Sequence, residues 1–371
     1  MEASPTESII SMEKQTAKLV ILFPKTAIVN THSCFCTFAF RMIKMQGFFR
    51  LTILGLLVIF SGSLVAGFDL NSPLVKRKKG RGSDFPDPIP QGESAKISIP
   101  IKRAGNLILM EVQIDSIVGN LILDTGAPHL VLNKTYFRNY PLYGNVMASG
   151  ITGGGGAGNQ TRVSRLVVAP GLYYSDVDAD IVPLGHLESR KGVKIIGLFG
   201  LNLLKRLEIE FHLDEGELII YRLSRSGART QVETAEDKLG KAKPIRIFQE
   251  NGLLLVPVTI NEKRLRFYID TGAETNILHS GSSKKVFEKV QLSRRTMLSG
   301  TGKEQAEVLS GELSEMFVDG HSYINMDVTI ANLNSLRSVY DSSIDGMLGY
   351  SFLSRRKLAI NFMKGELYLW D

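Results

Sequence analysis

The sequence predicts an all-β fold built from two related lobes, and three observations support this prediction. The sequence Asp-Thr-Gly-Ala occurs twice, at residues 124–127 and 270–273, each time between apolar, strand-like stretches. The chain has 371 residues, more than a single hydrophobic core usually holds, so two domains are expected. Apolar residues alternate with other residues at period two and long helical periods are scarce, which is typical of antiparallel strands.

The repeat extends well beyond the tetrapeptide. An offset of 146 residues (270 − 124) superimposes Ile99 on Ile245. Farther along the chain an offset of 149 residues (346 − 197) superimposes the Gly-Glu-Leu run at 216–218 on the same run at 365–367. Two copies are too few for a solenoid, which needs at least three repeats to bury its faces. The duplicated halves are therefore expected to pack as paired lobes.

The composition is that of a globular protein and gives little support to nucleic-acid binding. Apolar residues make up 44% of the chain and charged residues 22%, with a net charge of +7. The basic residues are scattered except for the run at 76–79 with Arg81. One basic run without interleaved aromatic residues indicates a solvated linker rather than a surface that stacks on bases. We therefore expect no nucleic-acid partner.

Cysteine and histidine spacing predicts no metal site and no cofactor. Cys34 and Cys36 both precede the repeat, so the lobes contain neither a disulfide framework nor a thiolate site. The histidines of the lobes are isolated in sequence: His129, His186, His212, His279 and His321. The two that follow a tetrapeptide, His129 and His279, are interpreted as strand-end or surface residues.

The N-terminal part predicts export or membrane attachment. Residues 1–44 form an N-terminal extension without clear periodicity, and translation is expected to start at Met42 or Met45. Residues 45–67 are predicted to be a signal peptide or a membrane anchor. A basic start, an apolar run and a small-residue exit favour a cleaved secretory signal, although the run also reaches the short limit of a spanning helix. Basic residues beyond the segment oppose an anchor that faces outward. The expected location is periplasmic, extracellular or membrane-anchored.

The rest of the chain divides into two linkers and two lobes. Residues 68–95 form a linker whose prolines cannot donate to a strand ladder. Lobe one is predicted at 96–223, a polar interlobe linker at 224–242 and lobe two at 243–371. The expected strands start near 97, 107, 120, 161, 179, 207, 217, 245 and 253, and short helices are expected at 201–206, 282–289 and 352–355.

Asp124 and Asp270 are the candidate catalytic residues. Each ends an apolar strand, and equivalent loops of a pseudo-twofold pair can converge on the symmetry axis. Two carboxyl groups about 3 Å apart cannot both ionise, so they share one proton and titrate as a unit. The ionised carboxylate can take a proton from water while the protonated one donates to the carbonyl oxygen of an amide. Peptide-bond hydrolysis without a covalent intermediate is the expected chemistry.

The neighbouring residues suit this chemistry. Gly126 and Gly272 permit close approach of the backbone and offer N–H donors to the carboxylates. Thr125 and Thr271 carry hydroxyls that could bond across the lobe interface. These four residues are therefore the predicted support of the two active loops.

Together these residues resemble the aspartic proteases. Each Asp-Thr-Gly-Ala loop is followed by an Ile-x-Gly element, at 195–197 and 344–346. Ala127 and Ala273 are similar to the retropepsin branch, whereas pepsin-like enzymes usually have Ser or Thr there. The resemblance covers residues 96–371. It implies two pseudo-twofold-related acid-protease β-barrel lobes with the active cleft between them, and both halves in one chain.

The function implied by the resemblance is an aspartic endopeptidase that cleaves protein or peptide substrates as a monomer. The alternative is a catalytically silent peptide-binding or scaffolding module of the same fold. The glycine run that contains Gly150, Gly153 and Gly154 is the candidate flap over the substrate, and the turn at 299–302 is its shorter counterpart in lobe two. Because Ala cannot donate a hydrogen bond to the dyad, activity is expected in mildly acidic to near-neutral conditions.

Overall fold

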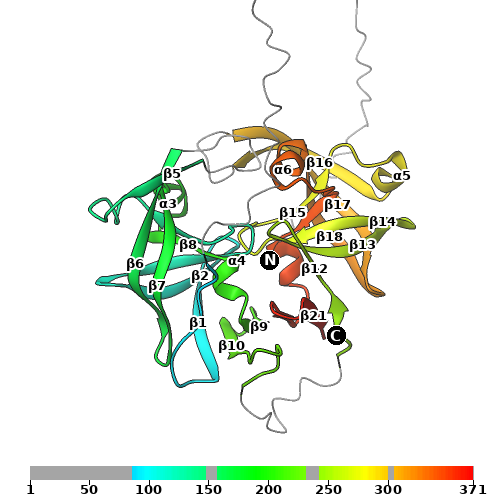
Figure 1. Cartoon of the computed structure of the whole chain (residues 1–371). Coiled ribbons are helices and arrows are strands. Elements are labelled where there is room, and N and C mark those ends of the chain that lie inside the picture. The colour runs from blue at the N-terminus through cyan, green and yellow to red at the C-terminus, as the bar shows by residue number, and fades with distance from the viewer. Residues whose placement is uncertain (1–85, 148–156, 231–241, 300–304, 371) are drawn as a thin grey trace, which may run out of the picture. The chain divides into compact units, whose positions relative to one another are not determined.

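The computed structural model describes residues 86–147, 157–230, 242–299 and 305–370 (Figure 1). The chain divides into two units, Met1–Lys76 and Arg77–Asp371, and all described residues belong to the second. The predicted extension at 1–44 and the signal peptide or anchor at 45–67 lie outside the described residues. Within the described part, no helix is long and apolar enough to cross a membrane.

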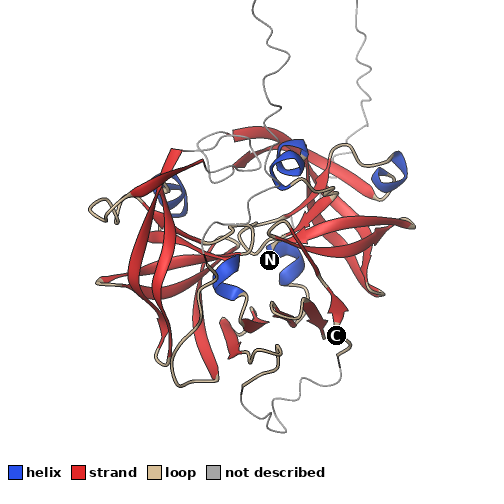
Figure 2. Ribbon diagram, viewed as in Figure 1, coloured by secondary structure: helices blue, strands red, loops and turns tan. Residues whose placement is uncertain are grey.

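Strands dominate both lobes, and the helices are short (Figure 2). The elements of lobe one are β1 Lys96–Ala104, β2 Leu107–Ile114, β3 Ile117–Asp124, β4 Leu130–Asn133, β5 Tyr143–Met147, β6 Ala157–Ala169, β7 Leu172–Val182, α3 Gly185–Lys191, β8 Ile195–Gly200, α4 Leu201–Leu204, β9 Leu207–His212 and β10 Glu217–Arg222. Those of lobe two are β11 Ile245–Arg246, β12 Phe248–Glu250, β13 Leu253–Ile260, β14 Lys263–Ile269, β15 Asn276–His279, α5 Lys284–Phe287, β16 Val290–Ser299, β17 Gln305–Val318, β18 His321–Ala331, α6 Asn334–Tyr340, β19 Gly346–Leu348, α7 Tyr350–Leu353, β20 Leu358–Asn361 and β21 Glu366–Leu369.

Each lobe closes into a six-stranded barrel. In lobe one the strands pair in the order β2–β3–β8–β4–β7–β6, and β6 returns to β2. In lobe two the order is β13–β14–β19–β15–β18–β17, and β17 returns to β13. The two orders are the same when the strands are matched by the sequence repeat. The predicted all-β fold of two related barrels is confirmed.

A third sheet joins the lobes. Its order is β11–β21–β20–β9–β10–β1, so its first three strands belong to lobe two and its last three to lobe one. The lobes meet where β9 pairs with β20, with Ile209 opposite Ile360. The repeat is preserved in the register, because Ile99 pairs with Leu218 and Ile245 pairs with Leu367. This junction sheet therefore spans the pseudo-twofold axis.

Hairpin turns and buried strand faces account for the barrels. Asp115, Asn261 and Asp319 have positive φ at hairpin turns, a conformation that Asp and Asn tolerate better than most residues. Strands that pack on both faces, such as β8 with all six residues buried, are continuous apolar runs. One core cluster contains residues of both barrels and of the junction sheet.

The structure differs from the sequence predictions mainly at helices. The helix expected at 201–206 is α4, which ends at Leu204, and the one expected at 282–289 is limited to α5. Helices α3 and α6 were not predicted. Each has seven residues and a single buried side chain, Leu187 or Leu336, too few for a helical period to show in the sequence. His129 and His279 lie at strand ends as expected, but both are buried rather than on the surface.

Candidate active site

The two aspartates lie at equivalent strand ends, one in each lobe. Asp124 is the last residue of β3, and Asp270 directly follows β14. Behind each loop passes the strand of the Ile-x-Gly element, β8 in lobe one and β19 in lobe two, parallel to the strand that carries the aspartate. At Gly197 a Cβ atom would lie 2.0 Å from the carbonyl oxygen of Val131, so only glycine allows this crossing.

The carboxyl groups of Asp124 and Asp270 face each other across the lobe interface. A Cβ atom on Gly126 would lie 2.6 Å from Oδ2 of Asp270, and one on Gly272 would lie 2.6 Å from Oδ1 of Asp124. Each carboxyl group thus lies against the glycine of the opposite loop. The structure brings together the two predicted catalytic residues and explains why both loops need glycine.

The two carboxyl groups have different backbone partners. The N–H groups of Gly126 and Ala127 donate to Oδ1 of Asp124 at 2.9 and 3.1 Å. Oδ1 of Asp270 accepts from Gly272 N–H at 2.9 Å. In both loops the alanine N–H donates to the backbone oxygen of the aspartate at 3.2 Å, so the bond from Ala127 to Oδ1 is the additional one in lobe one. Additional N–H donors stabilise the ionised form of a carboxyl group. The negative charge of the pair is therefore favoured on Asp124.

The pKa values follow from burial and from this asymmetry. Burial raises the pKa of Asp124 above its ordinary value, and the two backbone donors oppose that increase. Burial also raises the pKa of Asp270, and the charge of Asp124 raises it further, well above the ordinary range. We infer that the proton shared by the pair lies on Asp270.

The predicted threonines connect the two loops by four hydrogen bonds. The hydroxyl of Thr125 donates to Ile269 O and that of Thr271 donates to Leu123 O, both at 2.8 Å. Each hydroxyl also accepts from the N–H of the other threonine at 3.0 Å. Because both side chains are fully buried, water cannot replace these bonds. The threonines therefore hold the active loops in register.

Replacing Thr271 by Ala is expected to lower the free energy of unfolding by about 2–4 kcal/mol, because it leaves Leu123 O and Thr125 N–H buried without a partner. Thr271→Ser keeps the hydroxyl and should lose much less. Chemical denaturation of both variants measures the difference. Equal stability of the Ala and Ser variants would contradict the role of the hydroxyl.

A cleft of about 650 Å³ opens over the dyad. Residues from both lobes line it, and lobe two contributes Tyr268 and Tyr340. The hydroxyl of Tyr268 lies 3.5 Å from Oδ2 of Asp270, and that of Tyr340 donates to Gly126 O at 3.3 Å. Burial raises the pKa of Tyr340 to about 12, with a contribution from the dyad charge, so its hydroxyl stays protonated. The repeat places Ile122 where lobe two has Tyr268, so the two walls of the cleft differ.

Other contacts between the lobes were not predicted from the sequence. Glu274, the residue after the second tetrapeptide, forms an ion pair with Lys191 at the end of α3. Glu274 also accepts from the backbone N–H of Asn106 at 3.1 Å, and its backbone oxygen accepts from the Asn106 side chain. Lys191 in lobe one and Tyr340 in lobe two both end a short helix that reaches the active loop of the other lobe. The unpredicted helices α3 and α6 thus help to fix the geometry of the dyad.

The candidate flap residues Gly150, Gly153 and Gly154 lie outside the described residues. The strands on either side of that run, β5 and β6, pair antiparallel. In lobe two the corresponding strands are β16 and β17, which also pair antiparallel. Described residues of β16 line the cleft: Ser293, Arg294, Thr296, Met297 and Leu298. The described part of the lobe-two hairpin therefore contributes to the substrate side of the site.

Comparison with known proteins gives one family match and a similar solved structure. Residues 256–352 match a family model described as aspartyl protease, a segment that lies within lobe two and includes Asp270. The search of curated proteins finds no match. Among solved structures, basic 7S globulin from soybean is similar, with 11% sequence identity, a TM-score of 0.46, and coverage of 75% of this chain and 94% of that one. The chain is an aspartic-protease-like protein with two barrel lobes.

Proposed function

We propose that the protein is an aspartic endopeptidase in which Asp124 and Asp270 activate one water molecule between them. The observation that carries this proposal is the reciprocal packing of each carboxyl group against the glycine of the opposite loop. Such packing holds two buried carboxyl groups close enough to share a proton, which supplies an acid and a base in one site. The cleft above the pair provides room for an extended peptide.

The hydrogen bonds support a separate role for each aspartate. Asp124, the ionised member, removes a proton from the water molecule as its oxygen attacks the carbonyl carbon of the peptide bond. Asp270, the protonated member, donates its proton to the carbonyl oxygen. The C–N bond of the resulting tetrahedral diol then breaks. Asp124 returns a proton to the leaving nitrogen, and Asp270 recovers a proton from one hydroxyl group of the diol. Both aspartates then return to their starting states.

We further propose that one chain forms the complete site and works as a monomer, because each lobe supplies one aspartate, one threonine and one glycine. The substrate is a protein or peptide in extended form, which binds in such clefts by strand-like backbone pairing and side-chain pockets. Export or membrane attachment through residues 45–67 remains a prediction from the sequence.

The proposal is tested by incubating the purified protein with a peptide library over a range of pH. The active dyad carries one proton, so the rate should rise as Asp124 ionises and fall as Asp270 ionises. Because burial raises the pKa of both aspartates and the charge of Asp124 raises that of Asp270 further, both limits should lie above those of isolated carboxyl groups. We expect cleavage with an optimum in mildly acidic to near-neutral solution, and inhibition by a hydroxyl-bearing mimic of the tetrahedral diol.

An optimum below about pH 3 would contradict the raised pKa values of the dyad. Binding of the mimic or of library peptides without any cleavage would instead favour the alternative function, a peptide-binding or scaffolding module of the same fold.

A further inference from the structure

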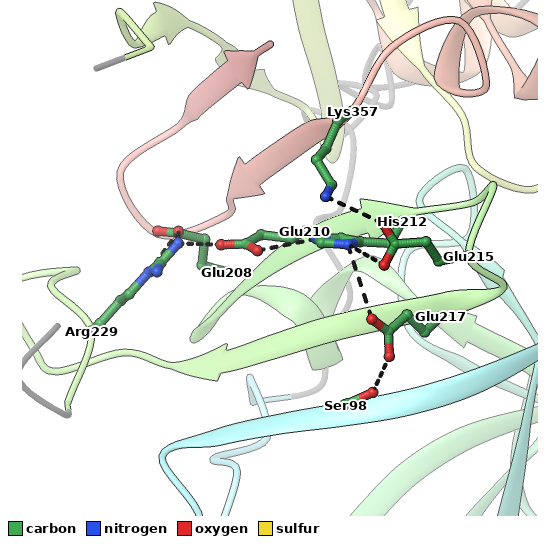
Figure 3. Close-up of polar contacts among 8 residues, drawn as sticks. All are labelled: Ser98, Glu208, Glu210, His212, Glu215, Glu217, Arg229 and Lys357. Carbon is green, nitrogen blue, oxygen red and sulfur yellow. Dashed lines mark hydrogen bonds and ion pairs between the residues drawn. The ribbon is translucent and has the colours of Figure 1, made fainter. Parts of the chain in front are cut away.

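A cluster of one histidine and several glutamates lies on the junction sheet, and none of its residues lines the catalytic cleft (Figure 3). His212 is the last residue of β9, and Glu217, the first residue of β10, is its direct cross-strand partner. Glu215 lies in the turn between these strands. The side chain of His212 is only 9% exposed, whereas those of Glu215 and Glu217 are 54% and 30% exposed. The histidine of the cluster is therefore buried, and the carboxylates of Glu215 and Glu217 are accessible to solvent.

We propose that His212, Glu215 and Glu217 bind a divalent transition-metal ion such as Zn²⁺. Nδ1 of His212 lies 3.3 Å from Oε2 of Glu215 and 4.0 Å from Oε1 of Glu217. One ligand atom from each of the three residues lies within 4.8 Å of the other two. Ligand atoms about 2.0–2.2 Å from a tetrahedral zinc ion are separated by about 3.3 Å, so only Glu217 needs to move appreciably. An imidazole with two carboxylates suits Zn²⁺ better than Ca²⁺ or Mg²⁺, which prefer oxygen ligands alone.

The hydrogen-bonded ion pair between His212 and Glu215 is longer than a strong charge-assisted bond. Charge-assisted N–H to carboxylate bonds are about 2.7–2.9 Å long. Another buried histidine–carboxylate pair is tight, since Nε2 of His129 lies 2.6 Å from Oδ2 of Asp180. His212 makes its contact with Glu215 at 3.3 Å. This separation is about that of two neighbouring ligands of a tetrahedral zinc ion, which would lie to one side of the line joining the two atoms.

The atoms that face away from the proposed ion are held by second partners, as in known metal sites. Nε2 of His212 lies 3.3 Å from Oε2 of Glu210, a buried carboxylate that also binds Arg229. The hydroxyl of Ser98 donates to Oε2 of Glu217, and Lys357 of lobe two lies 3.5 Å from Oε1 of Glu215 (Figure 3). The remaining atoms, Nδ1 of His212, Oε2 of Glu215 and Oε1 of Glu217, are the proposed ligands.

The repeat supplies an independent comparison, because lobe two contains the same hairpin without two of the three ligands. The offset of 149 residues places Asn361 at the position of His212, Lys364 at that of Glu215 and Glu366 at that of Glu217. Nζ of Lys364 lies 4.0 Å from Oε2 of Glu366, so a lysine supplies the positive charge in that hairpin. Ala359 likewise stands where lobe one has Glu210. In lobe one a bound cation would take the place of this lysine.

The test is titration of the full, chelator-treated chain with Zn²⁺ by calorimetry, together with thermal unfolding. We expect one equivalent to bind and to raise the midpoint of unfolding, because the folded state alone brings the three ligands together. His212→Ala should weaken this binding more than about 100-fold, since even outer partners of metal ligands contribute about 10–100-fold. Glu215→Gln, in an exposed turn, should weaken it at least about tenfold without disturbing the fold.

Glu366→Gln, at the equivalent place in lobe two, is the matched control and should bind Zn²⁺ as the original chain does. The proposal is overturned if the original chain takes up no stoichiometric Zn²⁺, which would leave His212 as a simple ion-pair partner. It is equally overturned if uptake persists in both His212→Ala and Glu215→Gln, which would place the ion elsewhere. Neither result bears on the dyad, so this test is independent of the proposed protease function.

Discussion

Asp270→Asn is expected to lower the rate of peptide cleavage by about 10²–10⁴-fold, the usual contribution of a general acid or base. The Asn side chain has nearly the same shape and can still accept from Gly272 N–H, so the active loop should keep its geometry. What the variant loses is the proton that Asp270 gives to the carbonyl oxygen. Steady-state kinetics on a library-derived peptide measures the loss, which should appear in kcat rather than in KM.

Asp124→Asn should cause a loss of similar size, because the two carboxyl groups act as a unit. For the same reason the double variant should be little slower than either single variant. Asp327→Asn is a matched control, since Asp327 also lines the cleft but is exposed and separate from the dyad. Equal cleavage by the original chain and by Asp270→Asn would refute the assignment of the dyad.

The dyad and its supports could be predicted because the repeat isolates them in the sequence. Asp124 and Asp270 recur with the same neighbours, and the register of the junction sheet preserves the same offsets. A pseudo-twofold site needs its residues in pairs, so residues that the duplication retains in pairs are candidates for it. The same reasoning finds Thr125 and Thr271, whose hydrogen bonds are symmetric in the structure.

The asymmetric parts of the site could not be predicted in this way. Tyr340 and Lys191 lie on helices of seven residues, too short for a periodic signal, and each acts on the loop of the other lobe. The contacts of Glu274 with Lys191 and Asn106 join residues 83 and 168 positions apart, which no local pattern indicates. The sequence did contain a signal for Tyr268. Two positions before Asp270 the repeat has tyrosine, whereas the equivalent residue in lobe one is Ile122.

The histidine cluster shows a different limit of sequence reasoning. A search for histidine or cysteine ligands at fixed spacing passes over His212, because its proposed co-ligands are glutamates on a hairpin. Their convergence depends on the cross-strand register that places Glu217 opposite His212. It also depends on the packing of lobe two, which brings Lys357 to Glu215. Register and packing between lobes are properties of the fold rather than of a short motif.

Gly272→Ala is expected to lower kcat by about 100-fold, the cost of displacing reacting groups by about 1 Å. Its Cβ atom would lie 2.6 Å from both Cγ and Oδ1 of Asp124, so the carboxyl group must move away. Gly185→Ala is the control, because there the nearest atom to a Cβ, Thr135 Oγ1, is 3.7 Å away. The control should keep its activity, and kinetics of the two variants gives the comparison.

The pH profile of Gly272→Ala distinguishes displacement of the dyad from general loss of structure. The charge of Asp124 contributes to the raised pKa of Asp270, so a larger separation of the carboxyl groups weakens this contribution and lowers that pKa. Asp270 then ionises at lower pH, and the alkaline limit of activity should shift to lower pH. A variant that merely unfolds would lose activity at every pH without a shift of this alkaline limit. Wild-type kcat with an unmoved alkaline limit would show that the close approach of Gly272 to Asp124 is not needed for the shared proton.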